Sequence, residues 1–326
     1  MNELLEMKNL SVEYRTGNGV AKAVNHLDFV IHKGEAVGLV GESGAGKTTT
    51  ALAAMSLLPD HIGFVSEGEI IFNGKSILDM KEKELSNIRG SKMSMIFQNP
   101  LTSLNPVFTV GHQISMVLKK HNKLGKKEAE KRAGEMLKMV GIPEYRLKDY
   151  PHQFSGGMRQ RVGIAAALAC SPELLIADEP TTALDVTIQA QILELMKQLQ
   201  KEYNTSLLMI THNLGIIAEL CEKVAIMYGG SIVEYGSVKE VFGNPKHWYT
   251  VGLLNAIPKI AGERERLMSI PGNVANAMKL PSGCKFHPRC SHCVERCTRD
   301  MPGMIKVADD HYVRCWNMEE EYGREK

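Results

Sequence analysis

The stretch Gly41-Glu42-Ser43-Gly44-Ala45-Gly46-Lys47-Thr48 decides the fold of this chain. Its spacing is G-x-x-x-x-G-K-T, and it lies between an apolar run at 36–40 and a helix-like stretch at 47–58. Glycines in such a loop let backbone N–H groups turn toward an anion, and the helix N-terminus adds partial positive charge. We therefore expect a nucleotide's phosphates to contact Gly41, Ser43, Gly44, Ala45, Gly46, Lys47, Thr48 and Thr49.

Three further motifs follow this loop in a fixed order. Ser155-Gly156-Gly157 precedes a helical pattern, the apolar run 174–177 ends in Asp178 and Glu179, and the apolar run 207–210 is followed by Thr211 and His212. An acidic residue at the end of a buried strand is a usual partner of Mg²⁺ in phosphate-loop proteins, with the loop Thr48 as a second ligand. Together the four motifs indicate a protein that handles a nucleoside triphosphate.

The composition is that of an ordinary globular protein of about two domains. The chain has 326 residues, is 44% apolar and 23% charged, and carries a net charge of +2, which gives no argument for a nucleic-acid partner. The N-terminus lacks the pattern of a signal peptide, and the apolar runs fall short of the roughly 18–20 residues of a membrane span. We expect a cytosolic protein that meets a membrane only through partners.

The pattern along the chain predicts an α/β core with an inserted helical region and a C-terminal extension. Strands are expected at 12–14, 24–31, 36–40 and 93–97, a hairpin at 69–78, and helices at 47–58, 126–140 and 247–256. The region from about 99 to 157 is helical in character and poor in strands. The character changes after Gly243-Asn244-Pro245, so we divide the chain into residues 1–242 and 243–326, with an irregular stretch at 270–283 and a charged tail at 319–326.

The combination of motifs resembles the ATP-binding subunits of ABC transporters over roughly residues 5–242. That resemblance implies a RecA-like P-loop NTPase core with an N-terminal antiparallel β subdomain and a helical subdomain. It also implies that Ser155, Gly156 and Gly157 cap the γ-phosphate of ATP held by a second subunit. Met158 stands where glutamine is commoner in this signature.

The resemblance assigns roles to residues outside the phosphate loop. Glu179 corresponds to the general base, His212 to the histidine that contacts the γ-phosphate, and Lys47 to the catalytic lysine. Gln98 corresponds to the glutamine that touches Mg²⁺ and senses the transmembrane partner. Residues 182–185, ending in Asp185, correspond to the loop between paired subunits, and Tyr14 to the aromatic residue that stacks on adenine.

The turn 98–106, which contains Pro100 and Pro106, resembles importers of oligopeptides, dipeptides and nickel in particular. Two C-terminal stretches, His247-Trp248-Tyr249-Thr250 and residues 283–290, resemble the C-terminal extension of the oligopeptide and dipeptide subunits. An importer subunit would pair with a homologous subunit or with itself, beneath two transmembrane permeases on the cytoplasmic side of the membrane, with an extracytoplasmic binding protein supplying substrate. The alternative is a soluble ABC-type ATPase of translation or DNA repair.

Five of the seven cysteines lie between residues 284 and 315. Cys284, Cys290, Cys297 and Cys315 are separated by five, six and seventeen residues, and Cys293 is an extra thiol. Such a cluster favours a metal in a cytosolic protein, and four thiolates suit a [4Fe–4S] cluster or zinc alike. The resemblance favours [4Fe–4S]; zinc, disulfides and free thiols stay open, and a nearby histidine could replace one ligand.

Overall fold

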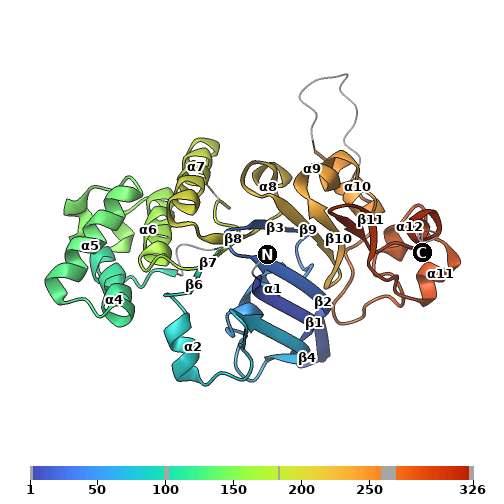
Figure 1. Cartoon of the computed structure of the whole chain (residues 1–326), viewed down its shortest axis with the longest axis horizontal. Helices are drawn as coiled ribbons and strands as arrows, with labels where there is room; N and C mark the ends of the chain where they lie inside the picture. The colour runs from blue at the N-terminus through green and yellow to red at the C-terminus, as the bar shows by residue number, and fades with distance from the viewer. Residues whose placement is uncertain (1–2, 99–102, 183, 258–268, 323–326) are drawn as a thin grey trace. The chain divides into compact units, whose positions relative to one another are not determined.

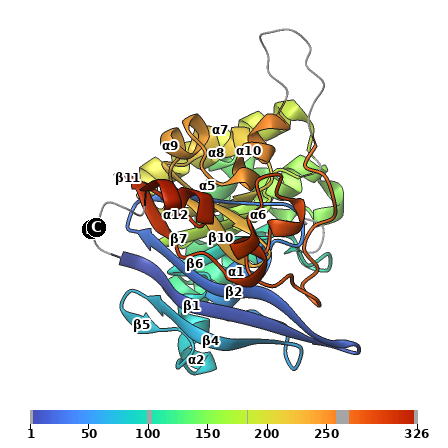
Figure 2. The same cartoon turned by 90° about the vertical axis from the view of Figure 1, so that its right-hand side faces the viewer.

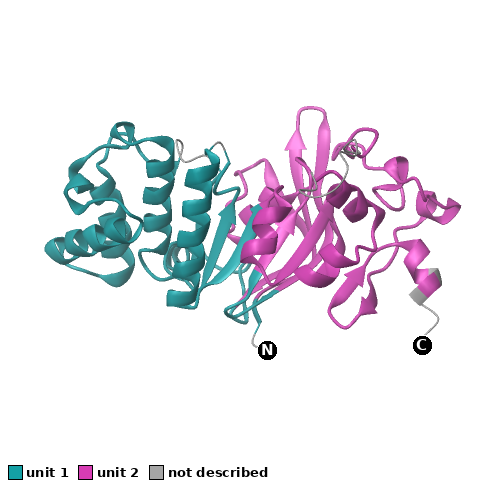
Figure 3. Cartoon of the chain, turned by 90° about the horizontal axis from the view of Figure 1, so that it is seen from above, with its two compact units in different colours: residues 1–4, 31–36, 73–210 teal, residues 5–30, 37–72, 211–326 magenta. Residues whose placement is uncertain are grey.

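The computed structural model describes residues 3–98, 103–182, 184–257 and 269–322. These form two compact units, which Figure 3 shows in different colours. Unit 1 comprises residues 1–4, 31–36 and 73–210, and unit 2 comprises residues 5–30, 37–72 and 211–326. Both units are built from segments that lie far apart in the sequence.

Unit 1 contains a parallel sheet whose strands are almost entirely buried. β6 (Met93–Ile96) pairs with β7 (Leu174–Asp178), which pairs with β8 (Ser206–Thr211). Every residue of β7 and β8 is buried, as expected for strands covered on both faces. Along the chain, α6 (Gly156–Leu168) precedes β7 and α7 (Val186–Tyr203) follows it (Figure 1).

The rest of unit 1 is largely helical, as the sequence predicts. It contains α2 (Glu82–Ile88), α4 (Val110–Asn122), α5 (Lys126–Met139) and the short helices η1 (Glu144–Lys148) and η2 (Pro151–Gln153). Ile114 and Leu118 of α4 and Ala129 and Ala133 of α5 are fully buried. The predicted hairpin is shorter than expected, because β5 spans only Lys75–Ser76 and the residues 77–78 are not in a strand.

Unit 2 contains an antiparallel layer of long strands, which lie side by side in Figure 2. β1 (Glu3–Thr16) lies between β2 (Gly19–His32) and β4 (Gly63–Phe72), and Leu5 pairs with Phe72 while Tyr14 pairs with Gly63. The first two strands are much longer than predicted. β1 begins well before the predicted strand, with Leu4, Leu5 and Met7 buried, and the facing ends of β1 and β2 near Thr16 and Gly19 are exposed.

A second sheet of unit 2 carries the phosphate loop and receives the end of the chain. Its order is β3 (Ala36–Val40), β9 (Lys223–Tyr228), β10 (Ser231–Ser237), β12 (His311–Val313) and β11 (Ile305–Ala308). β3 and β9 are parallel, and the remaining pairs are antiparallel. His311 Nε2 lies 2.7 Å from Glu234 Oε1, and both side chains are fully buried, so an ion-pair-type contact fixes β12 to β10.

The helices of unit 2 correct several predicted boundaries. They are α1 (Lys47–Ala54), α8 (Leu214–Leu220), α9 (Val238–Gly243), α10 (Trp248–Asn255), η3 (His287–Arg289), α11 (Glu295–Arg299) and α12 (Trp316–Tyr322). α1 ends before the predicted residue 58, because Ser56 has a φ of 49°, which a right-handed helix does not allow. Residues 319–322, the first part of the charged tail, belong to α12.

Candidate nucleotide site

The phosphate loop joins β3 to α1 within unit 2, as predicted. Gly44 and Gly46 have φ values of 82° and 104°, in the region where side chains are strained. A Cβ built at Gly46 would lie 2.4 Å from the carbonyl oxygen of Ala23, and one at Gly41 would lie 2.2 Å from that of Met227. The surrounding chain of unit 2 therefore requires glycine at both ends of the loop.

Lys47 is the first residue of α1, and its ammonium group lies against the loop. Its Nζ donates to the carbonyl oxygens of Gly41 at 2.7 Å and Glu42 at 3.0 Å, and the residue is only 7% exposed. The next residue, Thr48, is exposed at the N-terminus of the helix. A buried cation beside an exposed hydroxyl at a helix N-terminus is suited to bind phosphate and its metal.

Tyr14 of β1 lies near the same helix. Its hydroxyl donates to Thr49 Oγ1 at 3.2 Å, and the side chain is partly exposed. Most of the residues expected to contact the adenine and the phosphates therefore belong to unit 2. The exceptions are Gln98, Asp185 and the residues of the second-subunit signature.

The two acidic residues lie at the end of β7 in unit 1. Asp178 is 2% exposed, and Glu179 follows it with a φ of 45°. Non-glycine residues in this region are uncommon and often mark a functional turn. The Glu179 N–H donates to the Ile210 carbonyl at 2.8 Å, which holds the turn against the end of β8.

The Glu179 carboxylate accepts two side-chain hydrogen bonds within unit 1. Gln98 Nε2 and Thr182 Oγ1 each lie 2.9 Å from its Oε2. The structure thus brings together the glutamine and the glutamate that the sequence assigned to one reaction. Residues 99–102 of the predicted proline-containing turn lie outside the described residues.

The glycine pair opens α6 as predicted, but its two members differ. Ser155 is the N-cap and its Oγ accepts from the Met158 N–H at 3.4 Å. A Cβ built at Gly157 would lie 2.7 Å from Ile188 Cγ2, so packing requires that glycine. A Cβ at Gly156 would meet no other atom of the described residues within 4 Å.

Asp185 lies in the loop that follows β7, and His212 lies in the loop that follows β8. Asp185 caps α7 by accepting from the Ile188 N–H at 2.9 Å, and it belongs to unit 1. Ala183, two residues earlier, lies outside the described residues. His212 is exposed after β8 and belongs to unit 2.

The cysteines at 284, 290, 297 and 315 lie near one another in unit 2. Burial, together with the neighbouring thiolates of Cys297 and Cys315, raises the pKa of the Cys284 thiol to about 12 and that of the Cys290 thiol to about 11. These cysteines form no disulfide. Within the described ranges, no three His, Cys, Asp or Glu side chains are arranged to hold a single metal ion. Cys293 is exposed.

Glu42 is the site residue that the sequence did not reveal. Its carboxylate accepts from Arg289 and its N–H donates to the Tyr249 hydroxyl, and all three residues belong to unit 2. Its two partners, Tyr249 and Arg289, lie in the C-terminal stretches around His247 and Cys284. The sequence of these stretches does not indicate what either side chain contacts.

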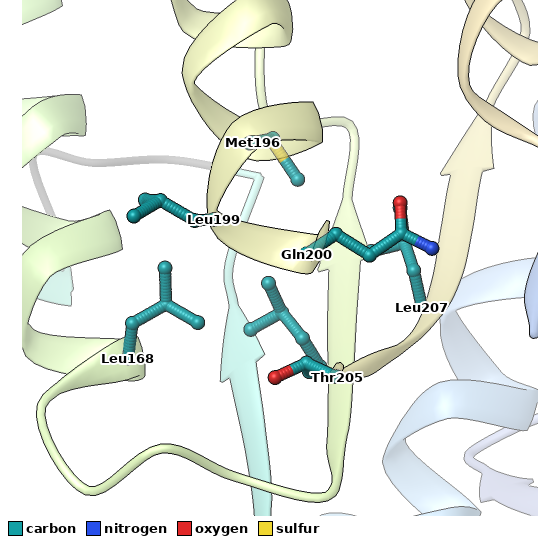
Figure 4. Close-up of a pocket in the computed structure, with 7 residues that line it drawn as sticks. Leu168, Met196, Leu199, Gln200, Thr205 and Leu207 are labelled. Atoms are coloured by element: carbon teal, nitrogen blue, oxygen red, sulfur yellow. The ribbon is translucent and has the colours of Figure 1, made fainter. Parts of the chain in front are cut away.

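A small cavity in unit 1 is a packing gap and not a ligand site. Figure 4 shows Leu168, Met196, Leu199 and Leu207 pointing into it, and its volume is about 10 Å³. This is room for about one water molecule between mostly apolar side chains. Among the described residues, no helix combines the length and the apolar character that a membrane crossing requires.

Comparison with known proteins agrees with this geometry. Residues 24–182 match the ABC transporter family model, and residues 233–297 match the model of the oligopeptide/dipeptide transporter C-terminal region. The oligopeptide transport ATP-binding protein OppD of Bacillus subtilis is 51% identical, covering 97% of this chain and 89% of the relative. The dipeptide transport ATP-binding protein DppD of the same organism is 46% identical, covering 97% and 95%.

Solved structures support the fold in the same way. An ATP-binding cassette, solved as a dimer in a post-hydrolysis state with ADP and Pi, superimposes with a TM-score of 0.66 at 30% identity, covering 72% of this chain and 99% of the other. A second dimeric structure of the same cassette, described as a bacterial ABC transporter cassette, gives a TM-score of 0.65, also at 30% identity and the same coverage. The predicted P-loop NTPase fold is thereby confirmed, and the chain belongs to the ATP-binding proteins of the ABC transporter family, in the group that carries the oligopeptide/dipeptide transporter C-terminal region.

Proposed function

We propose that this chain is the ATP-hydrolysing subunit that powers import of oligopeptides or dipeptides through an ABC transporter. The observation that carries the proposal is the phosphate loop, with glycines that unit 2 requires and Lys47 at the N-terminus of α1. The relatives that share about half of its residues are transport ATP-binding proteins for oligopeptides and dipeptides, which favours import over translation or DNA repair.

ATP binding is assigned to residues of both units. In unit 2, the loop residues 41 and 43–49 hold the phosphates, Tyr14 stacks on the base and His212 contacts the γ-phosphate. Thr48, Gln98 and Asp178 are the residues suited to hold Mg²⁺, which neutralises charge on the phosphates when bound. Oxygen donors of this kind are those that Mg²⁺ prefers.

Hydrolysis is assigned to Glu179 as the general base that orients the attacking water. The bonds from Gln98 and Thr182 fix one oxygen of its carboxylate, and the positive φ directs the residue out of the strand. Positioning by fixed hydrogen bonds supports this role, because phosphoryl transfer asks the protein mainly for alignment and charge stabilisation.

A second subunit completes the site in this proposal. Ser155, Gly156 and Gly157 would cap the γ-phosphate of ATP bound to a partner, and Asp185 would lie at the shared interface. The open space at Gly156 supports this, because nothing described in this chain requires a glycine there. A helix N-terminus without side-chain bulk can approach an anion closely. The partner is a homologous subunit or a second copy.

The membrane partners follow from the family. Two permease subunits would receive the conformational change, and an extracytoplasmic binding protein would supply the peptide, with this chain on the cytoplasmic face. The division into a nucleotide-binding part at 1–242 and an extension at 243–326 stays a prediction.

Glu179→Gln tests the proposed function. The variant should bind ATP as the wild type does, accumulate as a nucleotide-bound dimer, and lose turnover by about 10³-fold, since the amide cannot accept the proton of the attacking water. Binding, size-exclusion chromatography and ATPase assays measure this. Glu194→Gln on exposed α7 is the matched control. Near-normal hydrolysis by Glu179→Gln would contradict the assignment, as would a monomeric nucleotide-bound form.

The four cysteines of the C-terminal extension are proposed to hold a [4Fe–4S] cluster, with zinc as the alternative. Three of the four thiols are buried, and Cys284 and Cys290 each lie near the thiols of Cys297 and Cys315, which supports a site for a cation because a bound metal stabilises thiolates. Anaerobic purification followed by iron, sulfide and zinc analysis separates the two. Iron and sulfide lost together in a Cys297→Ser variant, with Cys293→Ser unaffected, is the expected result; a zinc-loaded protein would favour the alternative.

A further inference from the structure

One arginine of the cysteine-containing segment reaches the phosphate loop. Arg289 Nη1 lies 2.6 Å from Glu42 Oε2, and Nη2 lies 3.1 Å from Oε1, so the guanidinium and the carboxylate form a two-point pair. The Arg289 side chain is 4% exposed and that of Glu42 is 27% exposed. Such bidentate pairs fix the orientation of both groups as well as their distance.

The arginine itself is held by three further groups of unit 2. Its Nε donates to the Pro271 carbonyl at 2.9 Å, Nη2 donates to the Ile270 carbonyl at 3.3 Å, and Nη1 donates to the Tyr228 hydroxyl at 3.4 Å. The bond to Glu42 raises the pKa of Arg289 above its already high ordinary value, so it is always charged. Its guanidinium is therefore a fixed positive group against the loop.

Glu42 is held at its backbone as well. Its N–H donates to the Tyr249 hydroxyl of α10 at 2.9 Å, and Tyr249 is fully buried. The Glu42 carbonyl oxygen accepts from Lys47 Nζ at 3.0 Å. One residue of the loop therefore connects two side chains of the C-terminal extension to the lysine of the phosphate site.

The pair between Arg289 and Glu42 also determines the charge at the loop. A lone carboxylate beside a triphosphate site would repel the ligand, because like charges at short range in a partly buried setting interact strongly. Arg289 neutralises that carboxylate and holds it in one direction. The Arg289 backbone is also fixed, because its N–H donates to the Phe286 carbonyl at 2.9 Å. Both residues lie between Cys284 and Cys290.

We propose that Arg289 is a positioning residue for ATP binding: by pairing with Glu42 it keeps the phosphate loop in its binding conformation and removes a negative charge from the nucleotide's path. The inference rests on the proposed function of the loop as an ATP site. It makes the folded state of the cysteine segment a condition for tight nucleotide binding.

Four full-length chains test the proposal: wild type, Arg289→Gln, Glu42→Gln and the double variant. Arg289→Gln leaves Glu42 unpaired, so the KM for ATP should rise by about 10-fold while kcat changes by less than about twofold, a tenfold change being the expected scale for one charge-assisted pair. Glu42→Gln should raise KM less. The double variant should return to within about threefold of the wild type, because no charge remains unpaired.

Two controls separate positioning from damage to the extension. Arg314→Gln removes another largely buried arginine, one that donates to the carbonyls of Ile232 and Pro302. It should leave KM unchanged. Arg289→Lys keeps the charge without the two-point geometry and should give an intermediate KM. Circular dichroism and melting of each variant confirm folding.

The outcomes are decisive in both directions. An Arg289→Gln variant with wild-type KM overturns the proposal. A folded double variant as impaired as Arg289→Gln overturns it too, since the unpaired carboxylate would then not be the cause of the loss. Failure of the proposed function looks different: the wild type itself would then bind no ATP, as measured directly with a fluorescent ATP analogue.

Discussion

Two glycine-led turns handle phosphate in the proposed mechanism, and they differ in what requires their glycines. At Gly41 and Gly46 of the phosphate loop, a side chain would collide with carbonyl oxygens of the same unit. At Gly156, before α6, a side chain would meet nothing among the described residues. The loop is therefore shaped by its own chain, whereas in the proposed mechanism the glycine at position 156 leaves room for the nucleotide of a partner subunit.

The largest effect is expected from breaking the loop. Gly41→Ala places a methyl group about 2 Å from the Met227 carbonyl, a contact that backbone must move to relieve. We expect a loss of more than about 3 kcal/mol in the free energy of unfolding, with loss of ATP binding. Urea denaturation and nucleotide titration measure both. A stable Gly41→Ala protein that binds ATP would contradict the requirement for glycine at this end of the phosphate loop.

The second effect isolates function from folding. Gly156→Ala should change the free energy of unfolding by less than about 1 kcal/mol, because a helix tolerates alanine and the space is open. ATPase activity should fall by about 10²–10³-fold, the usual result of disturbing a preorganised anion site. Gly157→Ala, which would meet Ile188, should instead destabilise the protein. An active Gly156→Ala variant would show that this turn does not contact nucleotide.

The third effect is a pH dependence of the free energy of unfolding, and it arises in unit 2, which carries the phosphate loop. Burial lowers the pKa of His247 from 6.5 to about 4, against an opposing effect of Glu234. Its Nδ1 accepts from the Tyr249 N–H at 3.1 Å and so caps α10. The unfolded chain protonates His247 more readily than the folded chain does. The contribution of neutral His247 to the free energy of unfolding is therefore complete above pH 6.5. It is lost as the pH falls toward 4, by up to about 3 kcal/mol.

Unfolding at about pH 7.5 and about pH 5 measures the dependence. His247→Asn keeps an acceptor at the cap without a titrating ring, so its stability should change less between the two pH values. An equal pH dependence in both proteins would assign the effect to other groups.

The sequence predicts the parts of the molecule that are local. The loop 41–48 and the end of β7 at Asp178 were predictable, because a buried parallel strand is a continuous apolar run and the turn after it has fixed spacing. The family roles assign Gln98 and Glu179 to one reaction but do not predict the hydrogen bond between them. The full length of β1 was not predicted, because the adjacent buried residues Leu4 and Leu5 break the alternation at its start and its last residues are exposed.

The contacts of the C-terminal extension were beyond the sequence. β12 has three residues, too few for a periodic signal, and its pairing with β10 spans about 77 positions of chain. The pair between Arg289 and Glu42 joins residues 247 positions apart. Each residue type is ordinary on its own, so only the tertiary fold shows that they meet.

The pairing of β12 with β10 has a consequence for anyone who shortens this protein. Glu234, Tyr235 and Gly236 of β10 are opposed by Val313, Tyr312 and His311. A truncation ahead of this hairpin would leave an open row of backbone donors and acceptors, with the Glu234 carboxylate stripped of its imidazole neighbour. Bare strands of that kind recruit other chains, so such fragments are expected to aggregate.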